Sequence, residues 1–256
     1  MGLSAQSVRN PTRKLIGAGF LDEGAVVRGK SGQPLTPLAL RADGAWFLGL
    51  KIGRRLVALA LVDFTGAIRM HRQEIHAHPH PDHIVNFART GIATFLDQVP
   101  GAARGRIGRL GIVTPFRLWD WGNEMAPWRG RDLQAELAQD LGLPVFLEND
   151  ASSACVAQLV FGRARLPADF LYLDVAHFVG GGLVLDGRLR IGAVPPDTRD
   201  ALLDATGRAM ARMPAAGIVR PPLTAGTLGR AARIPGASAL PLTHFFQPDG
   251  ALDNSG

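Results

Sequence analysis

The stretch from residue 144 to residue 162 constrains the fold of this chain most strongly. An apolar run ends at Asn149 and Asp150, and a segment of small residues follows from Ala151 to Gly162. The apolar run predicts a buried strand and the small residues predict a helix behind it. In α/β proteins, ligands bind beyond the carboxyl ends of strands, so a carboxylate at this position predicts a binding site.

Alternating strand and helix patterns surround this stretch between residues 46 and 193. The expected strands are residues 46–53, 56–63, 67–75, 109–114 and 169–175. The expected helices are residues 81–99 and 132–141, the second with Gly142 as its C-cap. Glycines then lead into a hairpin that turns at Asp186 and Gly187. This order predicts an α/β protein in which two halves enclose a cleft.

Differences in composition and in strand and helix pattern divide the chain into four regions. Residues 1–41 are short, basic and rich in turns, and residues 46–163 carry the first half of the alternating pattern. Residues 168–213 begin the second half. Residues 214–256 are rich in Ala, Pro, Gly and Arg without a sustained period, so we expect an irregular or disordered tail. A shifted reading frame after a lesion would produce such a tail.

Composition narrows the classes of function. With 256 residues and 46% hydrophobic content, the chain can bury a substantial core. It has no uninterrupted apolar window of about 18 residues and no signal pattern, which predicts a cytoplasmic protein without a membrane partner. Cys155 stands alone and is expected to be a buried helical residue. Four histidines are interleaved with prolines between residues 76 and 83, so we expect a polar loop and no metal site.

The amino-terminal segment is a second candidate site. The net charge of +6 suits phosphate-bearing partners, although a GC-rich coding sequence also gives an arginine excess. Residues 3–40 predict a short helix, a stop at Gly19, and two strands at residues 25–27 and 35–40 around a basic turn. A helix followed by a basic hairpin is the arrangement of a winged helix-turn-helix. A solvated basic hairpin without DNA contacts is the alternative.

Polar and cationic side chains of this segment suit phosphate oxygens and base edges. The candidate DNA contacts are Ser4, Gln6, Ser7, Arg9, Asn10, Arg13, Arg28, Lys30 and Gln33. Pro11 interrupts the expected helix at a cost of about 3 kcal/mol. A helix that starts late, with Asn10 as N-cap, avoids this cost but leaves Gln6 and Ser7 outside it. Because one helix alone precedes the hairpin, we expect a partial winged helix in a chain truncated at its start.

Three segments resemble the ROK family of repressors, open reading frames and kinases. They are residues 48–55, 147–151 and 178–187, and the similarity runs through about residues 1–193. The resemblance implies an actin-like, hexokinase-type fold of the ribonuclease H-like class with two lobes. Here a partial winged helix precedes the fold, and the second lobe is expected to be incomplete. Kinases of the family phosphorylate sugars with ATP, whereas its regulators bind operator DNA and respond to a sugar or a protein.

The two phosphate loops that the resemblance implies argue against ATP chemistry. The first loop reads Lys51-Ile52-Gly53-Arg54-Arg55, in which a cation replaces the acid of the kinases. The second loop, residues 176–182, keeps Gly180, Gly181 and Gly182 but has lost its leading glycines, so backbone cannot approach phosphate in the same way. We favour close packing of a strand as the role of these three glycines.

The resemblance places Asp150 at the base position of the kinases and Asn149 at a neighbouring sugar ligand. Asp150 would also serve as the N-cap of the following helix, and the two roles are compatible. After Ala193, the Glu, Gly-His and Cys-rich motifs of the family are absent, so the sugar site lacks part of its expected ligands.

We therefore expect a sugar-responsive ROK regulator that binds DNA through its amino-terminal segment and has lost kinase chemistry. Its expected partners are operator DNA, a sugar or sugar phosphate, and a second copy of itself, with no cofactor. Two alternatives remain: an ATP-dependent sugar kinase that uses Asp150 as base, and a non-functional truncated remnant.

Overall fold

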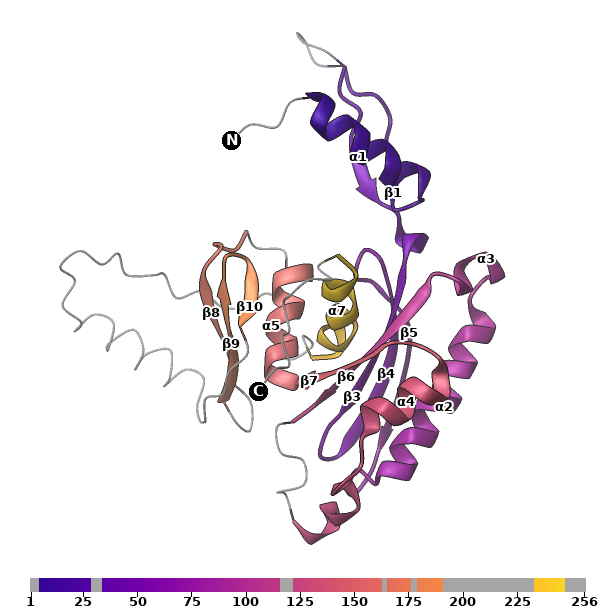
Figure 1. Cartoon of the computed structure of the whole chain (residues 1–256), viewed down its shortest axis with the longest axis vertical. Helices are drawn as coiled ribbons and strands as arrows, with labels where there is room; N and C mark the ends of the chain where they lie inside the picture. The colour runs from indigo at the N-terminus through magenta and orange to yellow at the C-terminus, as the bar shows by residue number, and fades with distance from the viewer. Residues whose placement is uncertain are drawn as a thin grey trace, which may run out of the picture.

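A five-stranded mixed sheet forms the centre of the protein. The computed structural model describes residues 5–28, 34–115, 122–162, 165–175, 179–190 and 233–246 (Figure 1). Strands β3 (Trp46–Ile52), β4 (Leu56–Asp63) and β5 (Ile68–Ile75) form an antiparallel meander. Strands β6 (Ile107–Thr114) and β7 (Val145–Asn149) then run parallel to β3, which gives the order β5-β4-β3-β6-β7. The predicted positions of these strands are confirmed.

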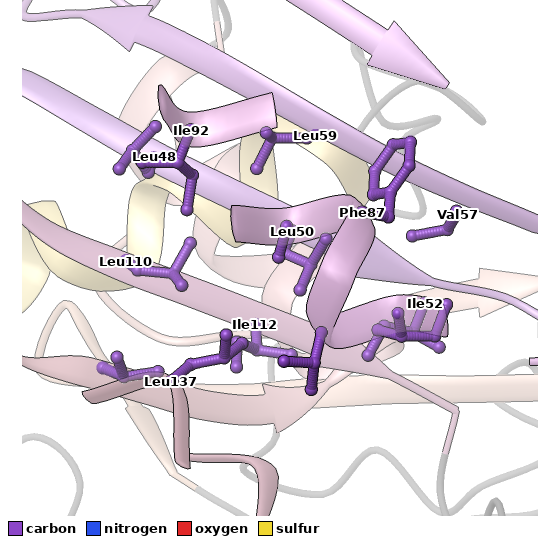
Figure 2. Close-up of a cluster of buried hydrophobic side chains, with 14 of the residues drawn as sticks. Leu48, Leu50, Ile52, Val57, Leu59, Phe87, Ile92, Leu110, Ile112 and Leu137 are labelled. Carbon is purple, nitrogen blue, oxygen red and sulfur yellow. The ribbon is translucent and has the colours of Figure 1, made fainter. Parts of the chain in front are cut away.

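Large aliphatic side chains fill one face of this sheet. Helices α2 (Pro81–Gln98) and α4 (Leu133–Leu141) cover that face, and α3 (Gly101–Arg104) and the 3-10 helix η3 (Asn123–Trp128) flank them. Alternate residues of β3, β4 and β6 pack against α2 and α4, as Figure 2 shows for Leu48, Leu50, Ile52, Leu59, Leu110, Ile112, Phe87, Ile92 and Leu137. The predicted cap of α4 is also present, because Gly142 adopts a φ of 62°.

Small residues line the opposite face. Here β3 carries Gly49, β4 carries Ala58 and Ala60, and β6 carries Gly111, all between the large residues of the first face. Helix α7 (Arg233–Phe246) packs on this face beside α5 (Asp150–Phe161). The approach is so close that a Cβ on Gly111 would overlap the carbonyl oxygen of Ala237. The missing side chains therefore create the space that the helix occupies.

The existence of α7 corrects the expectation that residues 214–256 lack regular structure, which is wrong for Arg233–Phe246. Pro235 lies in the first turn of α7, where its missing N–H removes no helical hydrogen bond. Pro241 does remove one, but Ala237, Ser238, Ala239 and Leu240 are fully buried. Burial therefore outweighs the cost of the second proline.

A second, smaller sheet packs on the far side of α5 (Figure 1). Strands β8 (Phe170–Val175), β9 (Val179–Leu185) and β10 (Arg188–Arg190) pair antiparallel in the order β10-β9-β8. The Asp186 and Gly187 turn has φ values of 54° and 71°, as a type I′ hairpin requires. The predicted hairpin is confirmed, and α5 lies between this sheet and α7.

The amino-terminal unit consists of α1 (Ala5–Gly17) and the strands β1 (Leu21–Glu23) and β2 (Leu38–Leu40), which pair antiparallel. Helix α1 runs through Pro11, so the late start with Asn10 as N-cap is wrong. Pro11 is exposed, and water can therefore satisfy the carbonyl that loses its partner. The first strand of the hairpin lies at Leu21–Glu23, so the predicted strand at residues 25–27 is wrong; Val27 forms only an isolated bridge with Leu35. The short 3-10 helix η1 (Ala42–Gly44) joins this unit to β3.

No helix among the described residues is long and apolar enough to cross a bilayer.

Replacing Gly111 tests the packing of α7 on the small-residue face. We expect Gly111→Ala to lower the free energy of unfolding by about 1–3 kcal/mol, because the new methyl group overlaps Ala237. Gly108→Ala, on the same strand, is the matched control because no atom lies within 4 Å of its Cβ position. Urea unfolding of both variants gives the measurement. Equal midpoints for the two variants would show that α7 does not occupy this face.

Candidate functional site

The carboxyl ends of three parallel strands meet at one edge of the central sheet. Lys51 of β3 pairs with Val113 of β6, and Thr114 of β6 pairs with Asn149 of β7. Gly53, Thr114 and Asn149 therefore follow one another along this edge. Since ligands of open α/β sheets bind at such an edge, the structure places the predicted site where the fold can hold a ligand.

Asn149 caps the helix that leaves this edge. Its Oδ1 atom accepts hydrogen bonds from the backbone N–H groups of Ala151 at 2.9 Å and Ser152 at 3.4 Å. The prediction that Asp150 is the N-cap is therefore wrong by one residue, since Asp150 is already the first residue of α5. The two backbone donors fix the orientation of the Asn149 amide, so its Nδ2 group is the part directed away from the cap.

Asp150 lies half-buried in the first turn of α5. The helix dipole and the N–H groups of this turn favour a carboxylate there. A carboxylate accepts hydrogen bonds, whereas the Nδ2 group of Asn149 donates them. The two neighbouring residues thus offer opposite hydrogen-bonding functions at one point.

Glu148 is a second acidic residue at this point, and it was not predicted from the sequence. Its Oε1 atom accepts a hydrogen bond from the backbone N–H of Asn149 at 2.6 Å. Burial raises the pKa of the Glu148 carboxyl, and this hydrogen bond offsets part of the rise. The signal that could have revealed it is a charged residue inside an otherwise apolar strand.

The three glycines of β9 pack closely against neighbouring backbone and side chains. A Cβ on Gly180 would overlap that of Ala151 in the first turn of α5, and one on Gly181 would overlap the carbonyl oxygen of Tyr172. A Cβ on Gly182 would lie 2.8 Å from Cβ and Sγ of Cys155. These contacts support close packing as the role of the glycines, and they bring the start of β9 beside the candidate site.

Only part of the two expected phosphate loops can be described. The first loop is a tight turn in which the Gly53 N–H donates to the Leu56 carbonyl at 2.8 Å, and Arg54 and Arg55 are exposed. The stretch 176–178 of the second loop lies outside the described residues.

Cys155 is buried, and burial raises the pKa of its thiol to about 12.

The histidines between residues 76 and 83 lie at the edge formed by β5 and the start of α2. The Nε2 atom of His83 lies 2.9 Å from Oε1 of Glu74. Burial lowers the pKa of His76, and the charge of His83 lowers it further. Among the described residues, no three His, Cys, Asp or Glu side chains are grouped so as to hold a metal ion.

Six of the nine candidate DNA contacts lie in the described residues. Helix α1 contains Gln6, Ser7, Arg9, Asn10 and Arg13, of which Arg9, Asn10 and Arg13 have exposed side chains. Arg28 is also exposed, beyond the β1–β2 pairing. Ser4, Lys30 and Gln33 lie outside the described residues. The structure therefore brings part of the set together on one exposed helix beside a hairpin (Figure 1).

Comparison with known proteins gives one family. A family model described as "ROK family" matches residues 47–195, which is more than half of the chain. The chain is 23% identical over 196 residues to the xylose repressor of Bacillus subtilis, covering 75% of this chain and 50% of the repressor. It is also 26% identical over 151 residues to the glucokinase of Streptomyces coelicolor, covering 57% of this chain and 45% of the kinase. The chain thus spans about half the length of the curated relatives it matches.

A solved structure shares the fold. It is a ROK family transcriptional regulator described as a homolog of the Escherichia coli Mlc protein. The TM-score is 0.53 at 22% identity, covering 87% of this chain and 64% of that one. The α/β, actin-like class predicted from the sequence is confirmed by this likeness and by the family match.

Substitution of Asn149 separates its capping role from any ligand contact. We expect Asn149→Ala to lower the free energy of unfolding by about 1 kcal/mol, because two N–H groups of α5 lose their acceptor. Asn149→Ser keeps a capping oxygen and should change stability by only a few tenths of a kcal/mol. Thermal or urea unfolding compares the two. Equal losses would contradict the assignment of Asn149 as the cap.

The raised pKa of Glu148 predicts that the stability of the fold depends on pH. Its folded-state pKa is raised, so the charged form is disfavoured in the folded protein and stability falls as pH rises from the unfolded-state pKa through the folded-state pKa. Glu148→Gln should lack this fall. The unfolding free energies of both proteins, measured from about pH 4 to pH 7, test this expectation. Parallel curves would show that Glu148 is not buried as described.

Proposed function

We propose that this chain, which belongs to the ROK family, is a sugar-responsive transcriptional regulator that binds DNA through its amino-terminal unit. The observation that carries the proposal is the helix and hairpin of residues 5–40, which precede the family match that begins at residue 47. The match to the xylose repressor covers 75% of the chain, whereas the match to the glucokinase covers 57%. Two observations support a regulator. Repressors are among the relatives, and a unit with exposed cations precedes the central sheet.

The amino-terminal unit offers a surface suited to the DNA backbone. Arg9, Asn10 and Arg13 are exposed on α1, and Arg28 is exposed on the hairpin. Arginine binds phosphate oxygens and guanine edges, and asparagine binds adenine edges. We therefore assign α1 to the major groove and the hairpin to the neighbouring phosphates, as in a winged helix.

The strand-to-helix junction offers a site for a sugar. With its Oδ1 atom held by the cap, Asn149 can donate through Nδ2, and Asp150 can accept. A hydroxyl both donates and accepts a hydrogen bond, so a pair of adjacent sugar hydroxyls matches this pair of residues. Such a site binds a monosaccharide or the sugar part of a sugar phosphate without any chemical step.

A sugar kinase is the second candidate, and one observation favours it. Asp150 stands at the start of a helix, where a carboxylate can accept the proton of a sugar hydroxyl during phosphoryl transfer. Against this, the turn after β3 carries Arg54 and Arg55 and has no acid to help hold Mg²⁺. Phosphoryl transfer from ATP depends on that metal.

DNA binding tests the regulator proposal. We expect the chain to bind a random-sequence duplex library with an affinity that falls steeply with salt, and repeated selection should enrich one sequence. Replacing Arg9, Arg13 and Arg28 together with Ala should weaken binding and reduce the salt slope by about one for each phosphate that is no longer neutralised. Arg129→Ala is the control, because Arg129 is exposed but lies outside the amino-terminal unit. Unchanged binding in the triple variant would refute this assignment, and no binding at all would favour a remnant.

Sugar binding tests the junction. Calorimetry with a panel of monosaccharides and sugar phosphates should identify a ligand, and Asp150→Asn should weaken its binding at least about tenfold. The same panel is to be assayed for ADP formation with Mg²⁺ and ATP. ADP formation that Asp150→Asn abolishes would overturn the regulator proposal in favour of the kinase.

A further inference from the structure

Hydrogen bonds and ring contacts join the amino-terminal unit to the first lobe, by which we mean the central sheet and the helices packed on it. The guanidinium of Arg106 donates to three carbonyl oxygens, those of Gly19 at 3.2 Å and of Asp43 and Gly44 at 3.3 Å. The backbone N–H of Phe64 adds one link, to the carbonyl oxygen of Ala42 in η1. The direction in which α1 and the hairpin leave the lobe is therefore set at one small junction (Figure 1).

Aromatic side chains fill that junction. We call the junction cluster the buried residues Ala45, Phe47 and Phe64 with the partly buried Phe20, Val160 and Phe161. The rings of Phe20 and Phe64 lie 5.5 Å apart at 53°, a favourable tilted contact. Phe20 comes from the amino-terminal unit, whereas Phe161 is the last residue of α5. The helix that begins at the candidate sugar site thus ends at the base of the amino-terminal unit.

The turn that carries Phe64 is held firmly in the lobe. The fully buried Asp63 accepts hydrogen bonds from the Thr65 N–H at 2.9 Å, the Thr65 hydroxyl at 2.7 Å and the Ala67 N–H at 3.0 Å. Burial alone would raise the pKa of Asp63, but these bonds and one from Arg69 outweigh it and lower the pKa. Gly66, at a φ of 86°, lies directly against the Phe161 ring. A displacement of α5 must therefore change the contact of Phe161 with this fixed turn.

Helix α5 is in close contact with β9 on one side and with α7 on the other. Its first eight residues after Asp150 are buried, and its closest contacts are with glycines: Gly180 and Gly182 of β9 and Gly236 of α7. Larger residues, Val184 of β9 and Leu240 of α7, share a buried cluster with Cys155 and Val156 of α5. The hydroxyls of Ser153 on α5 and Ser238 on α7 are buried and have no hydrogen-bond partner within the described part of the chain, a cost that a different relative position of the two helices can relieve.

We propose that α5 couples the sugar site to the amino-terminal unit. A sugar that binds Asn149 and Asp150 displaces α5, and the displacement alters the packing of Phe161 on Phe64 and Phe20 and so reorients α1 and the hairpin. A helix of 12 residues spans about 18 Å and moves as one body, because its backbone hydrogen bonds are internal. The coupling to DNA affinity rests on the proposed function, whereas the mechanical link does not.

Phe161→Ala removes the link while leaving both proposed binding surfaces intact. We expect the sugar to change the DNA affinity of the wild-type chain by about 5- to 150-fold, the range typical of allosteric coupling. In Phe161→Ala this factor should fall to about one, whereas the sugar affinity itself stays within about threefold of wild type. Phe170→Ala, a partly buried ring of β8 outside the junction cluster, is the control. Undiminished coupling in Phe161→Ala would overturn the proposal.

A distance measurement tests the link without sugar or DNA. Spin labels on Arg13→Cys and Arg129→Cys report the position of α1 relative to the lobe, and buried Cys155 is shielded from the labelling reagent. We expect Phe161→Ala to shift or broaden the distance distribution and Phe170→Ala to leave it unchanged. An unchanged distribution in Phe161→Ala would refute the link. Failure of the proposed function would instead appear as absent sugar or DNA binding, with the altered distribution still present.

Discussion

The fold depends on the difference in side-chain size between the two faces of the central sheet. Large aliphatic residues of β3, β4 and β6 fill one face and pack under α2 and α4. On the other face, Gly49, Ala58, Ala60 and Gly111 leave no side chains that would hold a helix away. Helix α7 therefore comes into backbone contact with the sheet, and α5 packs beside it. Because α5 is positioned in this way, the junction at Asn149 and Asp150 has a defined place at the sheet edge.

Much of this arrangement could be predicted from the sequence, because local patterns determine it. Strand β4 was predicted to the residue, since an apolar run bounded by turns leaves little choice. The hairpin at Asp186 was equally clear, because its turn needs two positive φ angles. Helix α7 was missed because it is apolar nearly all round and contains two prolines. Only its contacts with distant residues make it a helix, and those contacts cannot be derived from a local window.

The candidate site could be located from the sequence, but its chemistry could not be assigned atom by atom. Asn and Asp are equally good N-caps, so the position where β7 ends decides between them. Once Asn149 is the cap, its amide presents a donor and Asp150 remains an acceptor. Glu148 was missed although it is a charged residue inside an otherwise apolar strand, and burial raises the pKa of its carboxyl. Close packing was expected for the three glycines of β9, and their contacts with α5 and β8 support it.

We propose that the junction between β7 and α5 binds a sugar through the Asn149 amide and the Asp150 carboxylate. The most direct test is the ¹⁵N NMR signal of the Asn149 side-chain amide, assigned by its loss in Asn149→Ser and followed while monosaccharides are added. The account predicts a saturable shift of this signal for at least one sugar, and a loss of the shift in Asp150→Asn. Sugar binding that leaves the Asn149 signal unmoved would contradict the account.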